Sequence, residues 1–121
     1  METKKLTNLK LLHKAAGGEV AVVKEVIELY MKQLPSLRIG FRTHLENRRW
    51  SELGNTARIA KTSAMTVGLN DLAGRLKQLQ VKIFQQVGFE SYQSYIDEFD
   101  QVTALAEIEL AEELYKLSSL N

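Results

Sequence analysis

Residues 50–79 read WSELGNTARIAKTSAMTVGLNDLAGRLKQL and contain the strongest structural signal in the chain. Small and apolar side chains recur there at alternating spacings of four and three, the period of one face of an α-helix. The buried stripe of a helix over residues 50–66 then consists of Leu53, Ala57, Ala60, Ala64 and Val67. The opposite, solvent-facing side carries Gly54, Arg58, Lys61, Thr62 and Met65. Because Arg58 and Lys61 are one turn apart, they form a small cationic patch.

The sequence before this segment predicts three helices. Thr7 or Asn8 can cap a short first helix, which ends at the glycine pair 17–18 because glycine adopts the positive φ that terminates helices. Residues 19–34 and 35–47 carry apolar side chains at helical spacing and predict a second and a third helix. The proline at the junction breaks or kinks the run and suits the first turn of the third helix, where its missing N–H costs nothing.

Two further helices follow residue 66. Gly68 is expected to stop the preceding helix, Asn70 can cap the next, and Gly88 closes that one. A last helix extends over residues 91–117, and we expect four of its acids mostly in water: Glu107, Glu109, Glu112 and Glu113. Since no stretch alternates as a half-buried strand does and the connections are short, the sequence predicts an all-α, up-and-down antiparallel bundle.

Composition narrows the possible functions. The 121 residues fit one domain over 1–121, with frayed tails at 1–5 and 118–121. A net charge of +1 provides no field to attract nucleic acid or an anionic membrane. The lack of cysteine excludes disulfides, thiolate metal sites and cysteine nucleophiles. No run approaches the roughly 18 apolar residues that span a bilayer, and the amino terminus lacks the apolar core of a signal peptide, so we expect a cytoplasmic protein without membrane insertion.

The motif ARIAKTSA at residues 57–64 resembles the A-H-x-x-K-G-S-A signature of histidine-containing phosphotransfer (HPt) domains. Arg58 falls on the phosphoryl-accepting His of that signature, and Thr62 replaces its usual Gly. The residues that match the signature are Ala57, Lys61, Ser63 and Ala64. The resemblance spans roughly residues 6–79 and implies a four-helix bundle of HPt type, with the first helix as a cover across one end.

The substitution at residue 58 changes the chemistry that the resemblance implies. Histidine accepts a phosphoryl group through a free nitrogen lone pair near neutral pH, because its pKa is about 6.5. A guanidinium stays protonated and has no such lone pair, so Arg58 is no acceptor. It can donate in a bidentate manner to carboxylates or phosphates, and can therefore still engage an acidic pocket. The β-branched Thr62, one turn later, narrows the space for a partner's loop.

The resemblance thus implies a signalling module of a two-component phosphorelay that docks a receiver domain or a hybrid histidine kinase without being an enzyme. It would compete with, or scaffold, genuine phosphotransfer proteins as a monomer, and would need no cofactor and no metal. Arg38 and Arg42 lie one turn apart on a helix that neighbours residues 50–66 in the resembled fold, and would extend the cationic rim. The expected docking residues are Arg58, Lys61, Thr62, Met65, Arg38 and Arg42.

Two other functions stay open from the sequence. Phosphoryl groups could pass through His44 or His13 instead, although neither lies in a matching motif and a histidine in a last helical turn is commonly solvated. The two histidines also lack the spacing of a zinc site. Alternatively, the bundle is a purely structural module and Arg58 an ordinary solvated residue.

Overall fold

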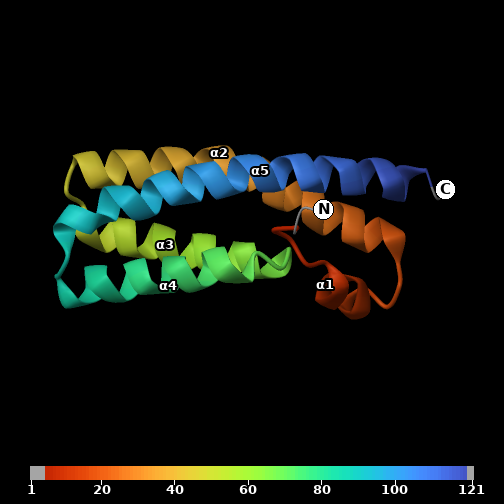
Figure 1. The fold of residues 1–121 in the computed structure, drawn as a ribbon, viewed down its shortest axis with the longest axis horizontal. Helices are drawn as coiled ribbons and strands as arrows, with labels where there is room; N and C mark the ends of the chain where they lie inside the picture. Colours follow the sequence, from red (N-terminus) through yellow and green to blue (C-terminus); the bar gives the residue numbers. More distant parts are fainter. Residues whose placement is uncertain (1–4, 120–121) are drawn as a thin grey trace.

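The computed structural model describes residues 5–119, which fold into five α-helices and one short 3₁₀ helix (Figure 1). The elements are α1 (Lys10–Ala15), α2 (Val20–Glu46), α3 (Trp50–Thr66), α4 (Asn70–Gln85), η1 (Phe89–Ser91) and α5 (Tyr92–Ser118). No strand occurs among these residues, so the prediction of an all-α chain is confirmed. The predicted fraying falls largely on residues 1–4 and 120–121, which lie outside the described part of the chain.

Four long helices surround one core. Helix α2 contacts α3 and α5, and α4 also contacts α3 and α5, so the contacts close into a ring (Figure 1). Short connections join the helices end to end, which makes consecutive ones antiparallel. The core draws its large side chains from all four helices, and Phe41 of α2 meets Phe99 of α5 edge to face with ring centroids 4.9 Å apart.

Helix α2 corrects the expectation of two separate helices over residues 19–34 and 35–47. It is one helix of 27 residues with Pro35 in its interior. A proline there costs about 3 kcal/mol, because it removes a hydrogen bond and crowds the preceding turn. Four large side chains that flank the proline are buried: Tyr30, Leu34, Leu37 and Phe41. Since burying each contributes about 1.5–3 kcal/mol, packing on both sides of Pro35 outweighs this cost.

Two helix ends also differ from the sequence prediction. Asn70 is the first residue of α4, after the N-cap Leu69, and no side chain caps this end. Helix α4 ends at Gln85, and Gln86 rather than Gly88 adopts the left-handed conformation directly after it, with φ of 58°. Gly88, with φ of 69°, precedes η1 instead. The turn between α4 and α5 therefore uses two left-handed residues.

The segment before α1, residues 5–9, crosses the α3–α4 connection and is called the N-terminal strap here. The backbone N–H of Asn8 donates to the carbonyl of Val67 at 3.3 Å. Gly68 stops α3 as predicted, with φ of 68°, and it also makes the crossing possible. A Cβ at Gly68 would lie 1.9 Å from the carbonyl oxygen of Asn8, a distance that no side chain can occupy. The strap thereby places α1 beyond the joined ends of α3 and α4, next to α2 (Figure 1).

Glu109 of α5 holds the strap from the other side. Its carboxylate accepts hydrogen bonds from the backbone N–H of Leu6 at 2.8 Å, the N–H of Thr7 at 3.0 Å and the Thr7 hydroxyl at 2.9 Å. Thr7 thus binds α5 rather than capping α1, while Asn8 Oδ1 accepts from the N–H of Lys10 at 3.1 Å. Burial raises the pKa of Glu109, but these hydrogen bonds and Lys5 more than offset it and lower the pKa below its usual range.

Substitution by alanine should have opposite effects on stability at Gly68 and Gly74. We expect Gly68→Ala to lower the free energy of unfolding by about 1–3 kcal/mol, because the new Cβ collides with Asn8 and φ is positive. Gly74 lies on the exposed side of α4, and an added Cβ there would have no heavy atom within 4 Å. Gly74→Ala should therefore raise the free energy of unfolding by about 1 kcal/mol. Urea denaturation measures both. A stable Gly68→Ala variant would contradict the crossing of the strap.

Acid should release the strap. Because the folded pKa of Glu109 is lowered, its contribution is present above the ordinary carboxyl pKa of about 4.3 and is lost as pH falls through the folded value. We expect Glu109→Gln to lower the free energy of unfolding by about 1 kcal/mol at neutral pH, and the difference from the wild type to vanish in acid. Denaturant titrations at both pH values measure this. The control is Glu112→Gln, on an exposed residue of the same helix, which should leave the free energy of unfolding unchanged at both pH values.

Candidate functional site

The buried stripe of α3 agrees with the sequence prediction. Leu53, Ala57, Ala60, Ala64 and Val67 are all fully buried. Three of these five side chains are single methyl groups, so α3 lies close to its neighbours α2 and α4. The position of the stripe fixes the rotation of α3 about its axis, and this rotation decides which residues face outward.

The outward face of α3 divides into two parts. Arg58, Thr62 and Met65 are exposed, Met65 by 58%. Gly54 and Lys61 are only half-exposed, which corrects the expectation of a single solvent-facing side. They lie along the seam between α3 and α4, where a Cβ at Gly54 would be 3.4 Å from Ile83.

Arg58 and Lys61, called the cation pair here, are both held by neutral amides. Arg58 Nη2 donates to Asn55 Oδ1 at 2.8 Å, one turn earlier on α3. Lys61 Nζ donates across the seam to Gln80 Oε1 of α4 at 3.3 Å. Neither cation forms an ion pair with any residue between 5 and 119. Their positive charge is therefore uncompensated within the described part of the protein.

The neighbouring hydroxyls of α3 are directed elsewhere. Thr62 Oγ1 donates to the carbonyl of Arg58 at 3.1 Å, so this hydroxyl is bonded to its own helix. Ser63 Oγ donates to Gln33 Oε1 of α2 at 2.7 Å and ties the two helices together. Each of these two hydroxyls thus already donates to a group of the described chain.

A shallow groove between α3 and α4 adjoins the cation pair. It is lined by Trp50, Ser51, Gly54, Asn55, Arg58, Gln80, Ile83, Phe84 and Gln86. The side chain of Phe84 is 87% exposed, which is the largest exposure among the large apolar residues of the described chain. Trp50 is fixed at the foot of the groove, since its ring centroid lies 5.1 Å from that of Phe89 and 5.7 Å from that of Tyr92. No sequence pattern predicts this groove, because its lining comes from two different helices.

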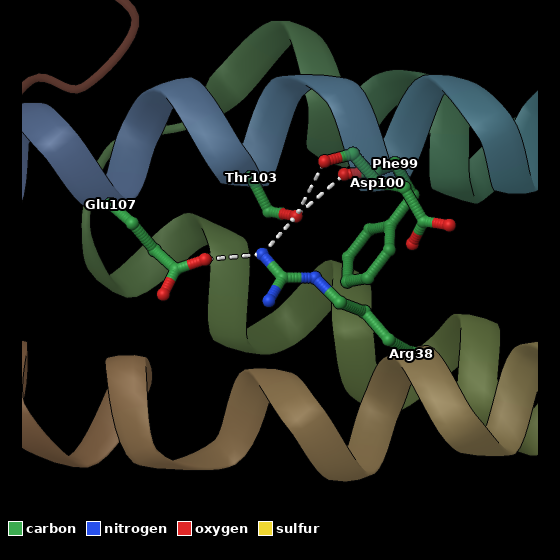
Figure 2. Close-up of polar contacts among 5 residues, drawn as sticks. All are labelled: Arg38, Phe99, Asp100, Thr103 and Glu107. Carbon is green, nitrogen blue, oxygen red and sulfur yellow. Dashed lines mark hydrogen bonds and ion pairs between the residues drawn. The ribbon is translucent and has the colours of Figure 1, made fainter.

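Arg38 and Arg42 do not join the cation pair, contrary to the expectation that they extend its rim. Figure 2 shows Arg38 reaching from α2 to α5, where Nη2 donates to Thr103 Oγ1 at 2.9 Å and to a carboxylate oxygen of Glu107. Arg42 Nη2 lies 4.0 Å from Asp100 Oδ2 on the same side. Both arginines thus face α5 and not α3. Glu107, expected mostly in water, is in fact the ion-pair partner of Arg38.

The contact between α2 and α5 leaves two polar atoms without partners among residues 5–119. Tyr30 Oη and Asp100 Oδ1 are buried and accept or donate no hydrogen bond there. Burial raises the pKa of Tyr30, with Glu107 adding to the rise and Arg38 opposing it. Burial likewise raises the pKa of Asp100, although Arg42 and Arg38 oppose that rise. These groups belong to the packing between α2 and α5.

The two histidines lie apart from the cation pair. His44, in the last turn of α2, is half-buried, and its Nδ1 is buried without a hydrogen-bond partner among the described residues. His13 of α1 has Nε2 4.0 Å from Glu113 Oε1 of α5. Residues 5–119 contain no group of three or more His, Asp or Glu side chains arranged to hold a metal ion.

Comparisons with known proteins add no family assignment. No protein-family model, no curated protein and no solved structure matches this chain. Within residues 5–119, every helix is too short or too polar to cross a membrane.

Arg38 should matter for stability and Arg42 much less. We expect Arg38→Met to lower the free energy of unfolding by about 1–3 kcal/mol. The substitution removes the charged partner of Glu107 and a hydrogen bond to Thr103. Arg42→Met should change it by no more than about 0.5 kcal/mol, since that pair is longer and Arg42 more exposed. Urea denaturation measures both. Equal effects would contradict the assignment of Arg38 to the α2–α5 contact.

Proposed function

We propose that this chain is an HPt-like signalling module that docks receiver domains of two-component pathways and transfers no phosphoryl group. One observation carries the proposal. Arg58 is exposed on α3 with its charge uncompensated, at the position where the resembled signature has its phosphoryl-accepting His. The ring of α2–α5, with α1 beyond the joined ends of α3 and α4, supports a four-helix bundle of HPt type.

The chemistry of the cation pair supports recognition without transfer. A guanidinium has no lone pair to attack phosphorus, but its planar N–H groups bind carboxylates and phosphates in pairs. The phosphorylation site of a receiver domain is an acidic pocket, and a cation without an internal partner suits such a pocket. Because no carboxylate of residues 5–119 pairs with Arg58 or Lys61, no internal ion pair has to break on docking.

The proposed docking surface follows from the site geometry. It consists of Arg58, Lys61, Thr62 and Met65 on α3, together with the α3–α4 groove and the exposed Phe84. Arg38 and Arg42 are left out, because they face α5. A charged centre beside an apolar edge is typical of transient signalling contacts, in which charge mainly sets the association rate and its salt dependence.

Docking predicts chemical-shift changes centred on α3. When the isotope-labelled chain is titrated with receiver domains from the same organism, we expect amide shifts around Arg58 and along the α3–α4 groove. Arg58→Ala should weaken binding about tenfold or more, because it removes the central charged donor. A structural module would instead show no shifts with any receiver, and this result would overturn the proposal.

Phosphoryl transfer is tested on the same receivers. After incubation with a phosphorylated receiver, the wild type should carry no acid-labile label, and the variants His44→Ala and His13→Ala serve as checks on the two histidines. The double variant Arg58→His with Thr62→Gly restores the acceptor and the small residue of the signature, and should gain label. The matched control is Arg58→Gln with Thr62→Gly. Label on the wild type that His44→Ala removes would contradict the proposed function.

A further inference from the structure

The outward face of α5 carries a band of apolar side chains that is open to solvent. Leu105, Ile108 and Tyr115 are 57%, 59% and 77% exposed, and Ala104 and Ala111 are exposed as well. These five residues, called the α5 band here, recur at helical spacing and so lie on one side of the helix. An apolar stripe of this width is typical of a helix side that packs against another element.

The charges around the α5 band do not oppose a close approach. Glu107 binds Arg38 of α2, and Glu109 accepts hydrogen bonds from the N-terminal strap. Of the acids in residues 104–116, only Glu112 is exposed, and Lys116 follows it one turn later with the opposite charge. Two copies of this face can therefore meet without the repulsion that like charges on an acidic helix would cause.

The order of small and large side chains along the α5 band is complementary to itself in reverse. Small and large alternate at spacings of four, three and four, in the order Ala104, Ile108, Ala111 and Tyr115. An antiparallel helix of the same sequence can thus place Ile108 opposite Ala111 and Tyr115 opposite Ala104. Each large side chain then meets a methyl group, as interdigitating helix surfaces require. A two-fold axis repeats every one of these contacts, which is the symmetry of a closed dimer.

We propose that the α5 band is a dimer interface, and that its occupant is the α5 band of a second copy of this chain in antiparallel orientation. The dimer replaces the monomer that the family resemblance implies. The proposal is independent of receiver docking, since α3 lies opposite α5 in the ring of four helices and stays free. Because the band covers only about three helical turns, the contact is small, and we expect a dissociation constant of about 1–100 μM.

Analytical ultracentrifugation over a range of concentrations measures the equilibrium between monomer and dimer. We expect the wild type to dimerise and Ile108→Glu to raise the dissociation constant at least about tenfold, because it places a carboxylate at the centre of the contact. The matched control is Met65→Glu, which introduces the same charge at a 58% exposed residue of α3 and should leave the dissociation constant unchanged. Both variants should unfold near the wild-type temperature, since both residues are exposed, and thermal denaturation checks this.

Exchanging one large and one small side chain tests the antiparallel pairing. Ile108→Ala should weaken the dimer about three- to tenfold, because two methyl groups then face each other across a gap. Ala111→Ile should weaken it by a similar factor, because two large side chains then collide. The double variant Ile108→Ala with Ala111→Ile again sets a large side chain against a small one, and should return the dissociation constant to within about threefold of the wild type.

Three results would each overturn the proposal. The first is a wild type that stays monomeric at about 1 mM, well above the expected dissociation constant. The second is a dimer that Ile108→Glu leaves intact, because the contact would then lie on another face. The third is a double variant that dimerises no more tightly than the two single variants, because small and large side chains would then not be paired across the interface.

Discussion

The close packing of α3 through its alanines is the constraint on which the rest of the structure depends. Ala57, Ala60 and Ala64 have no rotamers and little volume, so α3 can lie against both α2 and α4 at once. A helix held this tightly on one face cannot rotate without burying charge or opening a cavity. Arg58 is consequently presented outward at a defined place, and the α3–α4 groove begins beside it.

Charges are used differently on the two sides of the molecule. On α5, Glu107 binds Arg38 of α2, and Glu109 binds the N-terminal strap, so these carboxylates join parts of the fold. On α3, the two cations meet only amide oxygens. With a net charge of +1, the chain has no general attraction for anions. Under the proposed function, the attraction for an anion is therefore local and comes from the cation pair.

The proposed function would give this chain a role in a relay that needs no phosphoryl acceptor. A guanidinium in place of an imidazole keeps the recognition of phosphate and removes the nucleophile, so contact with a partner would end in dissociation and not in transfer.

The sequence by itself determined the helical class, the buried stripe of α3 and the outward position of Arg58, because helical periodicity is a local property. It also identified Gly68 as a stop, but not that Asn8 passes over it. Only the tertiary structure decided which residues Arg38 and Glu109 bind. Arg38 binds Glu107, 69 residues away, and Glu109 binds Leu6, 103 residues away. Spacing along a helix shows which residues share a face, whereas the neighbour of that face depends on how distant helices pack. For the same reason, burial on both sides of Pro35 made one helix where local rules predicted two.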